Sequence, residues 1–156
     1  MTDYAKKPWI LVDIDGTLTE GTKRAEKYLR KENPDWDGYF NACGEDEPIQ
    51  PIITLVETLA EKFEIVLCTG RRQSCDKATR EWLKKNTRLP EGLAIIYRKD
   101  GDTRHDIYVK PERLVEFIEK SGKDVLPFAI FEDRNSMVAK WRSMGFTCLQ
   151  VAEGDF

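Results

Sequence analysis

Short apolar runs alternate along this chain with stretches in which apolar residues recur every three or four positions. The short runs are typical of buried strands, and the periodic stretches are typical of helices that pack one face on a sheet. Regular alternation of the two predicts parallel β-α-β units. We therefore expect an α/β, Rossmann-like fold with one parallel sheet of about five strands flanked by helices.

The pattern predicts five strands and four long helices. The strands are expected at Trp9 to Ile14, Glu64 to Cys68, Leu93 to Arg98, Phe128 to Phe131 and Phe146 to Val151. The helices are expected at Ile52 to Lys62, Asp76 to Lys85, Pro111 to Lys120 and Ser136 to Met144. Gly122 and Gly145 follow the last two helices, where left-handed residues commonly end a helix.

The connection from Thr19 to Pro51 is unusual, because about 30 residues rich in Gly, Asn, Asp, Glu and Pro separate the first strand from the first long helix. An insertion beside a strand end favours a small cap over a site, at residues 20–50. A surface excursion without a role is the alternative. The length of the chain suits one core, so residues 1–156 are interpreted as a single domain.

Composition narrows the class of protein. Apolar residues make up 40% and charged residues 34%, as in an ordinary soluble globule. A net charge of −3 argues against a broad basic surface that grips long duplexes, so a nucleic-acid partner would be engaged locally. The apolar run from Trp9 to Val12 is too short for a signal peptide core or a membrane span. We expect a cytoplasmic protein with no membrane partner.

The four cysteines do not form a recognisable metal or disulfide pattern. They are Cys43, Cys68, Cys75 and Cys148, and no two have C-x-x-C spacing. Buried free thiols are favoured over a disulfide framework or a zinc site. The single histidine, His105, would need cysteine help to build a zinc site.

The motif D-I-D-G-T directly follows the first predicted strand. Asp13 and Asp15 lie two residues apart, so their side chains should emerge on the same side at the carboxyl end of the strand, where open α/β sheets bind ligands. Such a pair can divide two tasks, nucleophilic attack on phosphorus and proton transfer. Gly16 allows the chain to turn there. Taken alone, the motif also fits a fragment of a calcium loop.

Other strand ends add complementary groups. Thr69-Gly70-Arg71 follows the second predicted strand, Lys110 lies after the third, and Glu132-Asp133 follows the fourth. An ordinary turn, a surface lysine and a helix cap are the alternatives for these three sites taken singly. Together they provide the groups that hold magnesium and a transferring phosphoryl group. This order resembles the four motifs of the haloacid dehalogenase superfamily of phosphatases.

Longer strings carry a closer resemblance. These are A-T-R-E-W-L at 78–83, R-K-D-G-D-T-R-H-D at 98–106, E-D-R at 132–134, W-R-S-M-G at 141–145 and Q-V-A-E-G-D-F at 150–156. They resemble the 3′-phosphatase domains of bacteriophage polynucleotide kinase/phosphatases over nearly the full chain. The sequence holds no G-x-x-x-x-G-K-[ST] loop, so no kinase half is expected in it.

The resemblance assigns roles to individual residues. It makes Asp13 the nucleophile and Asp15 the general acid/base, with Thr69 and Lys110 orienting the phosphate. It implies magnesium as the cofactor, and the carboxylates considered as its ligands are Asp13, Asp15, Glu132 and Asp133. Glu132 is a departure, since the family has aspartate there.

Substrate contacts also carry over from the resemblance, namely Arg24, Gly70, Arg71, Arg98 and Asp106. Arginine forks suit phosphate oxygens, and Asp106 would orient one of them. Solvated surface charge is the alternative for Arg24 and Arg98. The stretch around Arg24 diverges from the family in length and composition.

The resemblance implies a magnesium-dependent phosphatase acting through an aspartyl-phosphate on 3′-phosphorylated DNA or RNA ends or nucleoside 3′-phosphates. A separate kinase or ligase would be a compatible partner. One rival is a sugar-phosphate or 5′-nucleotide phosphatase of the same superfamily. The other is a phosphate-binding module without activity.

Overall fold

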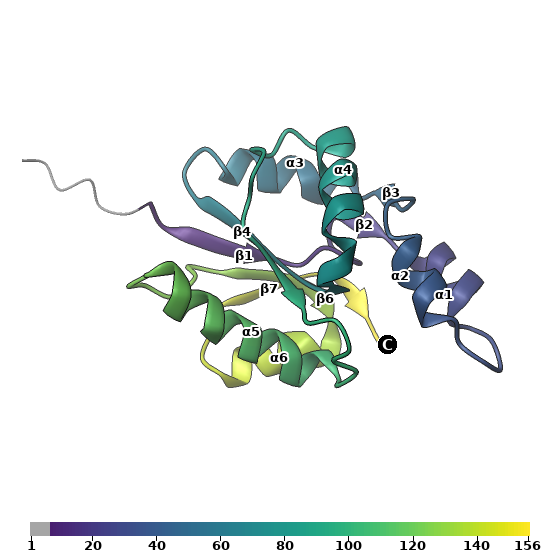
Figure 1. Ribbon diagram of the computed structural model, residues 1–156. Coiled ribbons are helices and arrows are strands. Elements are labelled where there is room, and N and C mark those ends of the chain that lie inside the picture. Colours follow the sequence, from purple (N-terminus) through teal and green to yellow (C-terminus); the bar gives the residue numbers. More distant parts are fainter. Residues whose placement is uncertain (1–6) are drawn as a thin grey trace, which may run out of the picture.

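A parallel sheet of five strands forms the centre of the computed structural model, which describes residues 7–156 (Figure 1). The strand order is β5-β4-β1-β6-β7, and every neighbouring pair runs parallel. The strands are β1 (Trp9–Val12), β4 (Glu64–Arg72), β5 (Ile95–Arg98), β6 (Ile130–Arg134) and β7 (Cys148–Gly154). The expected α/β, Rossmann-like class is therefore confirmed.

Helices cover both faces of this sheet. In Figure 1, α3 (Gln50–Leu59) and α4 (Asp76–Asn86) lie on one face, and α5 (Asp106–Ser121) and α6 (Asn135–Ser143) lie on the other. Because side chains alternate along a strand, Ile10 and Val12 join one buried core while Trp9 and Leu11 join the other. Burial on both faces explains why β1 is apolar at every position.

Two predicted boundaries near the strand ends were wrong. The β4 strand continues through Thr69 and Gly70 to Arg72, so this segment is no turn; a short 3-10 helix, η1 (Gln73–Cys75), follows it. The α5 helix begins at Asp106, so Pro111 lies inside the helix and not at its first position. The remaining boundaries differ by no more than three residues, and Gly122 and Gly145 have the expected positive φ.

The start of α5 depends on His105. Its Nδ1 accepts a hydrogen bond from the backbone N–H of Ile107 at 3.3 Å, which satisfies one free donor of the first turn. Beginning the helix there places Lys110 in its second turn, where the side chain is buried and not on the solvated surface. The lysine can therefore reach the end of β1.

The long connection after β1 folds into short elements of its own. It contains α1 (Thr22–Tyr28), α2 (Trp36–Asn41) and a small antiparallel ribbon of β2 (Thr19–Glu20) and β3 (Glu47–Pro48). Figure 1 shows α1 and α2 beyond the carboxyl ends of the sheet strands. We refer to residues 20–50 as the insertion.

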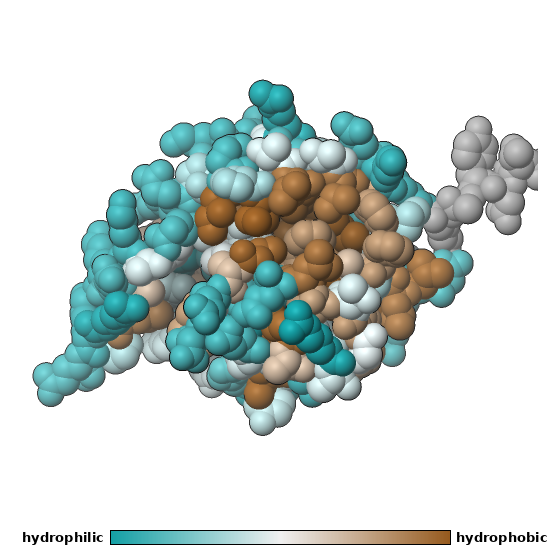
Figure 2. Space-filling view, turned by 180° about the vertical axis from the view of Figure 1, so that it is seen from behind, coloured by the Kyte–Doolittle hydropathy of each residue, from teal (hydrophilic) through white to brown (hydrophobic). Residues whose placement is uncertain are grey.

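The surface and the cysteines add two observations. The rear face has a broad hydrophobic area (Figure 2), and exposed apolar side chains occur on α3, before β6 and on β7, at Leu55, Phe128 and Leu149.

All four cysteines are buried and free, as expected. Within residues 7–156 no helix is both long and apolar enough to cross a membrane.

Candidate active site

Asp13 lies at the end of β1, buried against a lysine from α5. Lys110 Nζ is 2.6 Å from Asp13 Oδ1 and 2.8 Å from Glu132 Oε2, so one ammonium group holds two carboxylates. Thr17 Oγ1 donates a hydrogen bond of 3.1 Å to the other oxygen, Asp13 Oδ2. These contacts fix the orientation of the Asp13 carboxylate in a water-poor environment.

A third carboxylate completes what we call the carboxylate cluster, which is Asp13, Lys110, Glu132 and Asp133. Oxygens of the three acids all lie within 4.8 Å of one another. Among the residues that the structure describes, buried Asp133 Oδ1 has no hydrogen-bond partner. Hard carboxylate oxygens with one unsatisfied atom fit a magnesium ion.

Gly16 is required for this cluster to assemble. Its φ is +88°, and an added Cβ would come within 2.0 Å of Asp133 Oδ2. Any side chain at this position would therefore be strained and would also displace the carboxylate. The glycine of D-I-D-G-T thus allows the turn after β1 to pass against the end of β6.

The carboxylate cluster is rich in negative charge. Burial, followed by the charge of Glu132, raises the pKa of Asp13 well above its ordinary value. The same two causes raise the pKa of Asp133 to about 6. Burial opposes the charge on Lys110, but Asp13 and Glu132 outweigh it and raise the lysine's pKa. Three carboxylates around one ammonium group favour binding of a further cation.

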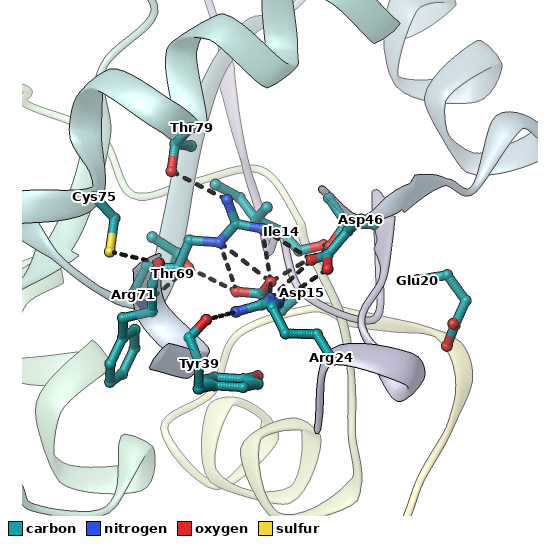
Figure 3. A network of polar contacts seen from close by, with 12 residues as sticks. Ile14, Asp15, Glu20, Arg24, Tyr39, Asp46, Thr69, Arg71, Cys75 and Thr79 are labelled. Atoms are coloured by element: carbon teal, nitrogen blue, oxygen red, sulfur yellow. Dashed lines mark hydrogen bonds and ion pairs between the residues drawn. The ribbon is translucent and has the colours of Figure 1, made fainter. Parts of the chain in front are cut away.

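Asp15 belongs to a second group, which we call the arginine cluster, made of Asp15, Arg24, Asp46 and Arg71 (Figure 3). Arg71 Nε lies 3.0 Å from Asp15 Oδ2, and Arg71 Nη2 lies 2.7 Å from Oδ1. Arg24 Nη2 lies 2.6 Å from the same Oδ1. Burial acts to raise the pKa of Asp15, but Arg71 and then Arg24 outweigh it and hold the pKa well below the ordinary range.

The insertion supplies half of the arginine cluster. Arg24 donates two hydrogen bonds to Asp46, at 2.9 and 2.8 Å, and a third to the backbone oxygen of Tyr39 at 3.0 Å. Its guanidinium carbon also lies 4.1 Å from the centre of the Tyr39 ring. Arg24 is only 5% exposed, so the reading of it as a solvated surface charge is wrong.

A further pair of arginines surrounds Asp106. Arg98 contacts one oxygen of Asp106 and donates to the backbone oxygen of Gly70 at 3.0 Å, while Arg134 Nη1 lies 3.0 Å from the other oxygen. Arg98 is buried, so it is not a solvated surface charge either. A Cβ at Gly70 would come within 2.8 Å of Asp106, which explains the glycine.

Thr69 links the sequence motifs at the centre of the site. Its hydroxyl lies 3.4 Å from Asp15 Oδ2 and accepts a hydrogen bond of 3.1 Å from the backbone N–H of Arg71. The structure thus brings the predicted residues together at one edge of the sheet. One detail differs from expectation, because the Asp15 side chain lies with the arginines, outside the group of three metal-fitting carboxylates. The alternative interpretation of Asp133 as a helix cap is wrong, since α6 begins after Arg134 without a side-chain cap.

Sequence reasoning missed several side chains that shape the site. They are Thr17, Tyr39, Asp46, Thr79 and Arg134. Thr79 on α4 accepts a hydrogen bond of 3.1 Å from Arg71 Nη1. Arg134 follows Glu132-Asp133 directly, so its position after a strand end was a usable signal. Asp46 lies in the acidic stretch Glu45-Asp46-Glu47, where nothing distinguishes one carboxylate from the next.

The fold and the ends of β1, β4 and β6 define a class. A parallel sheet of this kind, with an acid pair, a threonine, a lysine and a second acid pair at one edge, fits the phosphatase domains of the haloacid dehalogenase type that the matching family model describes. The family model for the polynucleotide kinase PNKP phosphatase domain matches residues 7–156, and the chain belongs to this family.

Known proteins agree with this assignment. One relative is 28% identical over 137 residues and is named "Putative bifunctional polynucleotide kinase/RNA ligase", from Autographa californica nuclear polyhedrosis virus. The match covers 86% of this chain but only 18% of that protein, so the chain spans about a fifth of its relative's length.

Solved structures show the same fold. A chain of a Pnkp1/Rnl/Hen1 complex has a TM-score of 0.75 at 24% identity, with 99% of this chain and 49% of that chain covered. A haloacid dehalogenase-like hydrolase of Streptococcus pneumoniae has a TM-score of 0.63 at 15% identity, with coverage of 92% and 83%. A class C acid phosphatase from Bacillus anthracis with tungstate bound has 0.62 at 16% identity, with coverage of 86% and 55%.

Proposed function

We propose that this protein is a magnesium-dependent phosphatase that removes 3′-phosphates from DNA or RNA ends, or from nucleoside 3′-phosphates, through an aspartyl-phosphate. The observation that carries the proposal is the pairing of the carboxylate cluster with the buried arginine cluster, in a chain of the PNKP phosphatase family. The first cluster suits phosphoryl transfer, and the second offers more cationic contacts than ester hydrolysis alone requires.

Asp13 is the nucleophile of the proposed reaction. Its carboxylate oxygen forms a bond to phosphorus while the bond from phosphorus to the leaving 3′ oxygen breaks, and Asp15 gives that oxygen a proton. In the second step water attacks the phosphorus, Asp15 takes the proton of the water, and Asp13 is released with inorganic phosphate. Lys110 and Thr17 keep the Asp13 carboxylate in one orientation throughout.

Asp15 can donate a proton only when Arg71 and Arg24 stabilise its ionised form less strongly than they do in the substrate-free protein. In the substrate-free protein Arg71 and Arg24 stabilise its ionised form. Phosphate oxygens accept the same guanidinium N–H groups. A bound phosphate that takes over these donors would weaken their hold on Asp15, so that its carboxyl group can carry the proton that the leaving oxygen needs.

Asp13, Glu132 and Asp133 are the residues that would hold magnesium. When bound, the ion offsets the repulsion between the phosphate and the attacking carboxylate. Glu132 keeps an oxygen donor where the family has aspartate, and its longer side chain reaches Lys110 at 2.8 Å. We propose that the Asp15 side chain does not bind magnesium, because it faces the arginines and lies outside the group of three metal-fitting carboxylates, which modifies the expectation that it is a ligand.

A comparison of kcat/KM for matched substrates tests the proposal. The set is an oligonucleotide with a 3′-phosphate, its 5′-phosphorylated isomer, a 3′-mononucleotide, a sugar phosphate and an aryl phosphate, at fixed magnesium and salt. We expect the 3′-phosphorylated oligonucleotide to exceed its 5′ isomer by about 100-fold, or about 2.7 kcal/mol of transition-state binding. A sugar phosphate that outruns both would move the assignment to a small-molecule phosphatase. Failure to hydrolyse any substrate would favour a binding module without activity.

A kinase or ligase acting alongside this phosphatase is part of the same proposal. The named activities of the viral relative and the composition of the Pnkp1/Rnl/Hen1 complex support it. Hydrolysis of a 3′-phosphate leaves a 3′-hydroxyl, which is the end that a nucleic-acid ligase joins to a 5′-phosphate.

A further inference from the structure

Three aromatic side chains gather on α2, the second helix of the insertion. Trp36 and Phe40 are stacked, with ring centres 6.2 Å apart and planes at 30°. Tyr39 meets both rings edge to face, at 6.0 Å from Trp36 and 5.5 Å from Phe40. We call these three residues the aromatic platform.

The aromatic platform leaves one large ring in contact with solvent. Trp36 is 51% exposed, whereas the other two rings, Tyr39 and Phe40, are half-buried. An exposed indole that is already supported by a second ring offers a flat surface at little cost in side-chain entropy. Such a surface binds other flat groups well, nucleobases among them.

An arginine lies beside the aromatic platform. Arg72 lies with its guanidinium carbon 4.5 Å from the centre of the Phe40 ring. The two acids beside Trp36 are engaged, because Asp37 pairs with Arg72 at 2.6 Å and Asp35 accepts a hydrogen bond from the backbone N–H of Gly38 at 2.8 Å. A cation next to stacked rings is the combination that single-stranded nucleic acids bind.

The platform is continuous with the active site. Tyr39 contacts the guanidinium group of Arg24, and Arg24 contacts Asp15; Figure 3 shows the Tyr39 ring beside Arg24 and Asp15. A phosphate bound at Asp13 and held by Arg24 would therefore place the terminal nucleotide on the side of Tyr39. Trp36 follows Tyr39 in this series of contacts, with its ring centre 6.0 Å from that of Tyr39.

We infer that Trp36, supported by Phe40, stacks the penultimate base of a single-stranded, 3′-phosphorylated nucleic acid. The inference rests on the proposed function and adds that the preferred substrate is a strand of at least two nucleotides with an unpaired end. A base held in a duplex has no free face for an indole, so a paired end must fray first.

A substrate series with variants of Trp36 tests this inference. The substrates are a 3′-phosphorylated mononucleotide, a dinucleotide, and the same dinucleotide without its 5′ base. The variants are Trp36→Ala, Trp36→Phe and the control Phe128→Ala. Phe128 is also an exposed aromatic residue packed on a phenylalanine, Phe63, but it lies just before β6, at the opposite edge of the sheet.

We expect the wild-type protein to favour the dinucleotide over the mononucleotide by about tenfold in kcat/KM, as the loss of one stacked base predicts. Trp36→Ala should remove most of this preference and leave mononucleotide hydrolysis within about twofold. Removing the base should have the same effect on the wild-type protein and little effect on Trp36→Ala. Trp36→Phe should restore most of the preference, and Phe128→Ala should preserve it.

Three results would overturn the inference. Equal losses on mononucleotide and dinucleotide in Trp36→Ala would assign Trp36 a structural role. An unchanged dinucleotide rate in that variant, or no effect of base removal in the wild type, would mean that the aromatic platform does not bind a base of the substrate. It would then be a surface for another partner, such as a protein. With each of the three results the wild-type protein still hydrolyses 3′-phosphates. They therefore differ from failure of the proposed function, in which no 3′-phosphate is hydrolysed and the inference is lost with it.

Discussion

The carboxylate cluster and the arginine cluster lie side by side, yet they differ in charge and in origin. The first has three acids around Lys110 and retains an unsatisfied oxygen on Asp133. The second pairs two acids with two arginines, Arg24 and Arg71, through several short contacts. The excess of negative charge in the carboxylate cluster favours binding of a cation. In the arginine cluster, by contrast, the guanidinium groups can bind a phosphate in place of their carboxylate partners.

The origin of the two clusters follows the architecture of the chain. Every member of the carboxylate cluster comes from the ends of β1 and β6 or from α5, which are parts of the central sheet and of the helices that cover it. Arg24 and Asp46 of the arginine cluster come from the insertion. We infer that the sheet edge carries the phosphoryl-transfer chemistry and that the insertion adds substrate placement. The following predictions test this division.

The largest expected effect is that of Asp13→Asn. Removing the nucleophile should lower kcat by about 10⁴-fold or more for every phosphate ester, whatever its leaving group. Steady-state assays with an oligonucleotide and an aryl phosphate measure this, with circular dichroism as the control for folding. Substantial turnover by the purified variant would remove Asp13 from the central role.

Asp133→Asn should have the next largest effect on activity. The loss of one charged oxygen from the carboxylate cluster should raise the magnesium concentration needed for half-maximal activity and lower kcat/KM by about 100-fold at fixed magnesium. Magnesium titrations of the wild type and the variant, on the same aryl phosphate, measure both effects. Full activity in EDTA, for either protein, would contradict a metal role for this cluster.

Arg24→Ala should distinguish placement of the nucleotide substrate from hydrolysis of the phosphate ester. It should cost about 30-fold or more in kcat/KM for a 3′-phosphorylated nucleotide but only a few fold for an aryl phosphate, because the guanidinium group orients the nucleotide. Arg24→Lys is the matched control, since it keeps the charge and loses the fork. Equal losses on both substrates would make Arg24 part of the general chemistry and weaken the division between the clusters.

The raised pKa of Asp133 predicts a pH effect on stability in the metal-free protein. Its folded-state pKa, about 6, exceeds the unfolded value near 3.8, so the folded state holds the proton more tightly. This contribution to the free energy of unfolding, about 3 kcal/mol, is complete below the unfolded pKa and is lost as pH rises through about 6. Urea unfolding between pH 4 and 7 should therefore show a steeper decline in the wild type than in Asp133→Asn. Parallel profiles would contradict the account.

Glu132→Asp should have the smallest effect. The substitution introduces the aspartate that the resemblance implies at this position and retains an oxygen donor, but the shorter side chain cannot keep the 2.8 Å contact with Lys110 without a shift. We expect a change of less than about fivefold in kcat/KM. Glu132→Ala is the matched contrast and should lose far more. An equal loss in the two variants would mean that side-chain length, and not the oxygen donor, matters at this position.

The carboxylate cluster was predictable because the carboxyl ends of parallel strands meet at one edge of a sheet. Asp13, Lys110 and Asp133 are far apart in sequence, but each follows a strand that hydrophobic periodicity predicts. The start of α5 was missed because Pro111 suggests a first helical position and histidine is not a usual N-cap. Asp46 and Tyr39 were missed because the short elements of the insertion have too little periodicity to fix which side chains point inward.

The most direct test of the account is to find where the phosphoryl group goes. The protein is mixed, in the presence of magnesium, with an oligonucleotide whose 3′-phosphate is labelled, or with the isomer whose 5′-phosphate is labelled. The reaction is quenched in acid within the first turnover, and the protein is digested for peptide mapping. The account predicts label on the peptide that contains Asp13, from the 3′-labelled strand and absent in Asp13→Asn. Label from both ends alike, label on another residue, or hydrolysis of the 3′-phosphate with no labelled protein at any time would contradict it.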